Sequence, residues 1–419
     1  MAHAGAELRD LAVAGSLLAL ALLVSGLWQR AVAQPPTAAG QHRDRFLDGL
    51  RAVAAIAVMA SHYGGNIVFA LTGAAATPVF HNLGTCGVQV FFALTGFLFT
   101  RKAVAARGQL VVRPFLLARL RRIVPMYAAA VAFSVALVCV VTRAEPVAWQ
   151  QLARQTVALF SFGFVLDGAP QIKNVPYVDV LGTIWSLPFE WLFYLFVPVL
   201  AVLVASPRML AAAGVVLAVY FGLLMTDGRG DVFCPFFLPG VLVGLLAELP
   251  SLASLSSLLQ GGEGRVRWVV TQHGAVDRPT SPNPLPPRRA GGEGRKTIAV
   301  VVLALAAVLP GVQNFTPLRL LLMTLLFGAM VLARPALLER RAVVFLGDIS
   351  YSIYLMHFPL LYAALAVLRG LDPAGAAPLW RAAALFAASG AVVAVSAVTW
   401  RWIEYPFLHR SGAPVPVLA

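Results

Sequence analysis

The sequence has few charged residues. Of its 419 residues only 12% are charged and 59% are hydrophobic, whereas an ordinary globular domain carries roughly 25% charged residues. A single water-soluble core cannot bury so much apolar surface, because burial saturates with size and long chains split into domains. The composition therefore disfavours soluble, disordered, all-β and disulfide-rich secreted proteins, and it indicates an all-α polytopic membrane protein.

Cysteine is scarce as well. The three cysteines, Cys86, Cys139 and Cys234, each lie in or beside an apolar run. They show no CxxC or Cys/His spacing, so the sequence predicts neither a disulfide framework nor a zinc site. A Walker A motif and a Rossmann fingerprint are also missing. We therefore predict no metal and no tightly bound cofactor.

Acidic residues are outnumbered, with 18 Asp and Glu against 32 Lys and Arg and a net charge of +14. In a soluble protein this excess would suggest a nucleic-acid partner. In a membrane protein, basic residues collect in cytoplasmic loops, and we predict no nucleic-acid binding. The clearest case is segment 101–122, which holds seven basic residues and no acidic one and is predicted to be cytoplasmic.

Eleven stretches are long and apolar enough to span a bilayer, for which about 17 to 25 residues are needed. A twelfth, 152–166, is short and polar at its start, and we interpret it as an interfacial or re-entrant helix. Counting it as a span would place the basic loop 249–297 outside, against the positive-inside bias. Eleven spans in the inner (plasma) membrane leave the C-terminus cytoplasmic. The predicted spans are 11–29, 46–70, 86–100, 114–141, 183–204, 209–226, 232–248, 298–313, 317–333, 343–368 and 379–400.

The chain divides into unequal parts. Residues 1–40 are expected to form an extra N-terminal transmembrane helix and a linker. The first span also resembles a signal peptide, but its acidic start, with Glu7 and Asp10, favours an uncleaved helix. Residues 41–410 are expected to form the main membrane domain, and 411–419 a tail. The interruption at 250–296 is rich in Gly, Pro and Arg and is predicted to be a flexible cytoplasmic loop.

Ionisable residues inside apolar spans are costly, at least about 2.5–3.5 kcal/mol each, and are functional candidates for that reason. Asp48, Arg51 and His62 fall on one stripe of a helix, and Asp48 and Arg51 are spaced to pair. His62 would lie about 16 Å beyond Arg51 at about 1.5 Å per residue. Its imidazole suits a general base. The residues alone leave open a histidine that only makes a hydrogen bond between helices.

Further polar groups support a site in the membrane. Glu190 and His357 place a carboxylate and a second histidine within predicted spans. Arg119 and Arg122 share one helix face at the cytoplasmic end of their span, in the same basic segment as Arg101. Arginine clusters suit a multiply phosphorylated cosubstrate, and histidines suit proton removal from a hydroxyl. Composition and spacing leave an enzyme and a proton-coupled transporter both open.

Five separated motifs follow one another in an order that resembles the acyltransferase-3 family of bacterial membrane O-acyltransferases. The resemblance covers 45–407, except the loop 249–297, and is to the stand-alone type without a fused extracellular esterase-like domain. Thr95 stands where the family usually has Ser, and it keeps the hydroxyl. The family core has ten spans, so the first helix is expected to be an addition. The motifs are Arg45–Ala52 through His62, Gly87–Leu98, Arg119–Tyr127, Trp185–Glu190 and Ile349–His357.

The resemblance implies transfer of an acyl group, often acetyl, from cytoplasmic acyl-CoA to a hydroxyl of a carbohydrate or glycosylated acceptor. On this hypothesis Arg119, Arg122 and Arg101 bind CoA, and His62 deprotonates the hydroxyl. In an alternative hypothesis, His62 carries the acyl group covalently. A proton-coupled transporter and a non-catalytic translocase are the rival hypotheses.

The remaining candidates are assigned supporting roles. Asp48 and Arg51 are expected to orient or stabilise the site. Glu190 and His357 are expected to contact the acceptor or to relay protons. The sequence does not indicate the acceptor, the acyl chain length or the oligomeric state.

Overall fold

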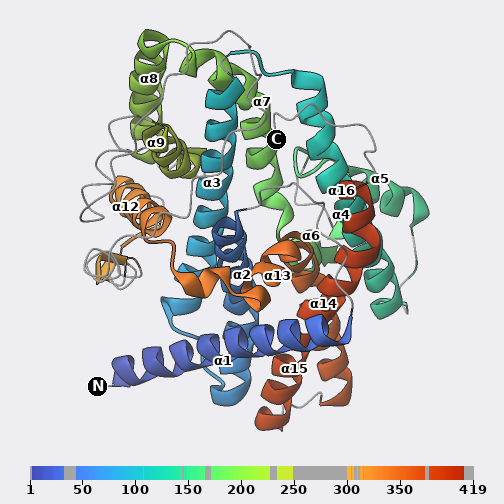
Figure 1. Cartoon of the computed structure of the whole chain (residues 1–419). Helices are drawn as coiled ribbons and strands as arrows, with labels where there is room; N and C mark the ends of the chain where they lie inside the picture. Colours follow the sequence, from blue (N-terminus) through green and yellow to red (C-terminus); the bar gives the residue numbers. More distant parts are fainter. Residues whose placement is uncertain are drawn as a thin grey trace.

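A computed structural model of the chain is almost entirely helical (Figure 1). It describes residues 2–32, 44–106, 108–143, 146, 148–165, 171–226, 234–248, 316–372 and 377–409, together with 300–302, 304, 305, 309 and 312–314. Among these, seven helices are long and apolar enough to cross a membrane. The prediction of an all-α polytopic membrane protein is confirmed.

The longer helices form the body of the molecule. They are α1 (Ala2–Ala31), α2 (Arg45–Thr72), α3 (Pro78–Ala106), α4 (Val112–Val141), α7 (Leu187–Val204), α8 (Pro207–Thr226), α12 (Pro317–Ala333), α14 (Ser350–Leu371) and α15 (Pro378–Thr399). The shorter elements are α5 (Trp149–Leu159), β1 (Gln171–Ile172), β2 (Val175–Pro176), α6 (Tyr177–Leu181), η1 (Ile184–Ser186), η2 (Cys234–Phe237), α9 (Leu238–Ala247), η4 (Ala336–Glu339), α13 (Arg341–Asp348), the π-helix η5 (Trp400–Glu404) and α16 (Tyr405–His409).

The predicted count of eleven spans stays a prediction. The seven long apolar helices begin within or before predicted spans, while predicted spans 232–248 and 317–333 correspond to shorter apolar helices. Span 209–226 is helical as α8, and span 298–313 is described only in part. The loop 250–296, the tail 411–419 and the sidedness of the C-terminus lie outside the described residues.

The segment 152–166 contains a helix that is too short to span a bilayer, and its interpretation as interfacial or re-entrant stays a prediction. Its helix α5 has 11 residues, which at about 1.5 Å per residue covers about 16 Å of a hydrocarbon core about 30 Å thick. The short antiparallel hairpin of β1 and β2 follows it. Lys173, in the hairpin turn, donates through its backbone N–H to Gln155 Oε1 at 3.1 Å, so the hairpin is tied to α5.

The prediction of one continuous span over 343–368 is wrong. The chain breaks at Ile349 between α13 and α14, where the backbone has φ −90° and ψ 5°. Ser350 Oγ donates to the Gly347 carbonyl at 2.7 Å and stabilises the break. Because α13 lies against the start of α2, the break lets α14 begin at the site described below.

Helix α2 lies within the bundle and packs against α3, α13 and α15 (Figure 1). The Asp44 side chain caps its first turn by accepting from Phe46 N, and Gly73 ends it in the left-handed conformation at φ 67°. Asp44 is also paired with Arg334 at 2.5 Å, which joins the end of α12 to the start of α2. Two glycines allow the closest contacts. A Cβ on Gly49 would lie 2.0 Å from the Leu338 carbonyl oxygen, and one on Gly347 would lie 2.0 Å from that of Asp48.

Replacing Gly49 by Ala is expected to destabilise the protein by about 1–3 kcal/mol, because the extra methyl overpacks a backbone contact. Gly65, on the same helix, has no atom within 4 Å of an added Cβ. Gly65→Ala is therefore the matched control, and it should be neutral or up to about 1 kcal/mol stabilising. Thermal unfolding of the purified protein in detergent measures both. Equal midpoints for the two variants would contradict the proposed contact.

Candidate functional site

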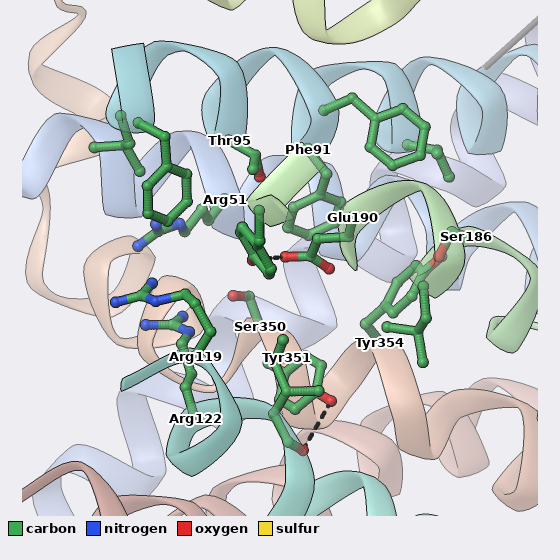
Figure 2. A pocket seen from close by; sticks show the side chains of 17 residues that line it. Arg51, Phe91, Thr95, Arg119, Arg122, Ser186, Glu190, Ser350, Tyr351 and Tyr354 are labelled. Atoms are coloured by element: carbon green, nitrogen blue, oxygen red, sulfur yellow. Dashed lines mark hydrogen bonds between the residues drawn. The ribbon is translucent and has the colours of Figure 1, made fainter. Parts of the chain in front are cut away.

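The first cavity, which we call the arginine chamber, gathers three guanidinium groups. Arg51 comes from α2, Arg119 and Arg122 come from α4, and Glu190 of α7 lies among them. The chamber holds about 90 Å³. Figure 2 shows the arginines at one end of the chamber and Ser186 with Tyr354 at the other. Arg119 and Arg122 line the chamber from the same side of α4, as predicted, and Arg51 lines it from α2.

The described lining of the arginine chamber has an excess of positive charge. The Glu190 carboxylate accepts a hydrogen bond from the Tyr194 hydroxyl on the next turn of α7. Arg119 lies over the Phe99 ring at 5.1 Å, and its Nε is buried without a hydrogen-bond partner among the described residues. Three guanidinium groups around one carboxylate leave the chamber suited to an anion, and the planar guanidinium fork matches phosphate geometry.

Asp48 and Arg51 form the predicted pair. Arg51 Nη1 lies 3.3 Å from Asp48 Oδ1, and the Asp48 side chain is 5% exposed. Asp48 is not among the described residues that line the chamber. It lies behind Arg51, where Gly347 packs against its backbone, so it contacts the site through Arg51.

The second cavity, which we call the histidine chamber, is larger, at about 440 Å³. His62 of α2 lines it together with residues from the start of α3 and from the segment before α7. His81, at its edge, is exposed, so the chamber reaches the surface of the protein. Its other polar and aromatic lining residues are Ser61, Thr85, Gln89, Thr183, Trp185, Tyr354 and Phe358.

The two predicted histidines lie together. The ring centroids of His62 and His357 are 5.2 Å apart. His62 Nδ1 lies 2.9 Å from the Val58 carbonyl, and His357 Nδ1 lies 3.1 Å from that of Ile353. A carbonyl oxygen only accepts, so in the neutral ring Nδ1 carries the hydrogen and Nε2 keeps its lone pair. His62 thus has a basic nitrogen available in a chamber, while His357 is buried behind it.

A narrow partition separates the chambers. Val88 and Tyr354 line both of them, and the Tyr354 and Ser186 hydroxyls are hydrogen-bonded at 2.7 Å. Along α2, the eleven residues from Arg51 to His62 rise about 16 Å. The partition therefore stands on the path between the guanidinium cluster and the histidine pair.

Two sequence-predicted residues lie away from their expected neighbours. Arg101 pairs with Glu248 at 2.9 Å and is not among the described residues lining either chamber. Glu190 lies with the arginines rather than with His357. Tyr354, Ser186 and Gln89 were not singled out from the sequence. Gln89 carried a usable signal, since it is a lone amide within the apolar stretch 86–100.

Comparison with known proteins identifies the architecture around these chambers. Residues 44–401 match the model of the acyltransferase-3 family, described as an acyltransferase domain. The chain belongs to this family. The match contains every residue named in the two chambers, and α1 lies before it. The expectation of a membrane-embedded acyltransferase is confirmed.

A curated relative of this acyltransferase is the peptidoglycan O-acetyltransferase OatA of Listeria monocytogenes serovar 1/2a. The two are 25% identical over 393 residues, which cover 87% of this chain and 56% of the relative. The chain therefore spans little more than half the length of that protein. No solved structure matches the chain.

We predict that the partition keeps reagents that enter the histidine chamber, on the side where His81 is exposed, out of the arginine chamber. The test uses Thr95→Cys, a residue that lines the arginine chamber, with the three native cysteines replaced by Ser. A membrane-impermeant maleimide added on the His81 side should label this position at least tenfold faster when Tyr354→Ala is also present. Tyr354→Phe keeps the ring and should stay near the slow rate. Equal labelling with Tyr354 and with Tyr354→Ala would contradict a closed partition.

Proposed function

We propose that this acyltransferase transfers an acyl group, most simply acetyl, from acyl-CoA to a hydroxyl of a carbohydrate or glycosylated acceptor. One observation carries the proposal. A chamber suited to phosphates and a chamber with a basic histidine nitrogen lie on one helix and share a partition. The OatA relative is a peptidoglycan O-acetyltransferase by name, which supports a carbohydrate acceptor.

The arginine chamber would receive the donor. Arg119 and Arg122 would bind the CoA phosphates from the cytoplasm, with Arg51 deeper in the chamber. Arg101 would act at the entrance, where it is held by Glu248. The long, flexible pantetheine arm would then extend past Tyr354 and bring the thioester toward His62. On this proposal the arginine chamber and the C-terminus lie on the cytoplasmic side of the inner membrane.

His62 would act as the general base. Its Nε2 takes the proton of the acceptor hydroxyl while the hydroxyl oxygen bonds to the thioester carbonyl carbon. The carbon–sulfur bond then breaks, and the CoA sulfur leaves with the electron pair. The proton passes from Nε2 to that sulfur. The products are an acyl ester and free CoA, and His62 is regenerated.

The other candidates would support this step. Arg51, paired with Asp48 at 3.3 Å, would balance the negative charge of the donor. Glu190, hydrogen-bonded to Tyr194, would hold the arginines apart in an open arrangement. His357 stacks behind His62 at 5.2 Å and would orient its ring or relay its proton.

Loss of the arginines is expected to weaken donor binding. Arg119→Ala and Arg122→Ala should each raise the Kd for CoA about 10- to 100-fold, because a hydrogen bond to a charged group contributes about 1.5–3 kcal/mol. Arg121 lies between them in sequence but is exposed, so Arg121→Ala is the matched control. Calorimetric titration of CoA into purified protein measures all three without any acceptor. Unchanged affinity in both test variants would exclude this donor site.

His62→Ala is expected to lower the transfer rate about 10²- to 10⁴-fold, the usual contribution of a general base, while CoA still binds with its original Kd. Transfer of radiolabelled acetyl from acetyl-CoA to a linear N-acetylglucosamine tetramer measures the rate. Near-normal transfer by this variant would exclude His62 as the base. Label that stays on the protein, absent in His62→Ala, would instead indicate a covalent acyl-histidine.

A further inference from the structure

Two buried polar groups of the histidine chamber have no hydrogen-bond partner among the described residues. Gln89 is 1% exposed and Thr183 is 2% exposed. Gln89 Nε2 and Thr183 Oγ1 make no hydrogen bond within the described part of the chain, and both residues line the chamber. A buried polar atom left unpaired is costly and calls for an explanation. A polar ligand in the chamber would supply one.

The orientation of the Gln89 amide is fixed by a neighbour. Arg319, fully buried, donates through Nε to Gln89 Oε1 at 3.2 Å. An arginine only donates, so the amide oxygen must face Arg319 and the amide nitrogen must point away from it. The Gln89 amide nitrogen is therefore an unpaired donor on the side away from Arg319, and Thr183 has a hydroxyl that can donate or accept; both residues line the chamber.

The described lining of the histidine chamber is mainly apolar, with a few polar groups, and its only ionisable groups of basic type are histidines. It includes no Asp, Glu, Lys or Arg, in contrast to the arginine chamber. The rings of Trp185 and Phe358 add apolar surfaces. Its volume of about 440 Å³ lies within the usual range for small-molecule sites, about 300–1,000 Å³. These properties fit an uncharged ligand that has hydroxyl groups and an apolar ring face.

We propose that the histidine chamber is the acceptor site, and that Gln89 and Thr183 hold an uncharged sugar ring so that one of its hydroxyls faces His62. The proposal rests on the proposed acyl transfer and deepens it. His81, exposed at the edge, lies where an acceptor enters from the surface. An anionic sugar would meet no Lys or Arg side chain in the described lining of this chamber and would be disfavoured. Gln89 and Thr183 are therefore specificity-determining residues for a neutral acceptor.

The test compares acceptor kinetics in three variants with acetyl-CoA as donor. Gln89→Met removes the amide donor at similar size, together with the oxygen that accepts from Arg319 Nε, and Thr183→Val removes the hydroxyl. In Gln89→Met, Arg319 keeps its hydrogen bonds to the backbone carbonyls of Leu309 and Val312 and to the Cys86 sulfur. Thr100→Val is the matched control, because Thr100 is also buried with an unpartnered hydroxyl on α3 but lines neither chamber in the described residues.

The acceptors are the neutral N-acetylglucosamine tetramer and its sulfated form. Each test variant should raise the KM for the neutral tetramer about 3- to 10-fold, as expected for one lost neutral hydrogen bond. The Kd for CoA should stay unchanged, and Thr100→Val should match the wild type. The sulfated tetramer should be used at least tenfold less efficiently by the wild type.

Several outcomes would overturn the inference while leaving the proposed function in place. These are an unchanged KM in both test variants, an equal rise in Thr100→Val, or a preference for the sulfated tetramer. Transfer to neither tetramer by a protein that binds CoA would also overturn the neutral-sugar site. If the wild type neither binds CoA nor cleaves acetyl-CoA, the proposed function itself fails.

Discussion

One helix sets the distance between the two chambers. Arg51 and His62 both belong to α2, and a helix has a nearly fixed rise per residue. The start of α2 is held by the backbone contacts at Gly49 and Gly347 and by the Asp44–Arg334 pair. The two functional groups therefore cannot approach each other without breaking the helix. A reaction that needs both requires a substrate long enough to reach from one to the other.

The buried charges are arranged around that helix. Carboxylates lie close to the arginines on more than one side: Asp48 pairs with Arg51, and Glu190 lies in the arginine chamber. Glu404, in the π-helix η5, is buried and accepts from Ser352 Oγ at 3.2 Å. π-Helical turns are rare and frequently occur at functional sites. Here the π-helix η5 brings the Glu404 carboxylate against Ser352 in the first turn of α14, just after the break at Ile349.

Local patterns predicted much of this arrangement. Helical periodicity placed Asp48, Arg51 and His62 on one stripe, and the fixed geometry of a helix made that prediction reliable. The pairing of His62 with His357 could not be predicted, because it depends on how α14 packs against α2. The break at Ile349 was missed because 343–368 is predominantly apolar despite Asp348 and His357, and the break lies beside a tertiary contact at Gly347. Arg101 was grouped with Arg119 and Arg122 by charge alone, whereas Glu248 holds it elsewhere.

The partition formed by Val88 and Tyr354 would also limit hydrolysis of the donor. A thioester is open to attack by any nucleophile, and water in the surface-connected histidine chamber would be by far the most abundant one. On the proposed function, Tyr354, hydrogen-bonded to Ser186, would separate the thioester of a donor bound by the arginines from the histidine chamber. Futile hydrolysis would then be limited by how often the tyrosine moves aside. An enzyme built this way would keep its acyl groups intact while it waits for an acceptor.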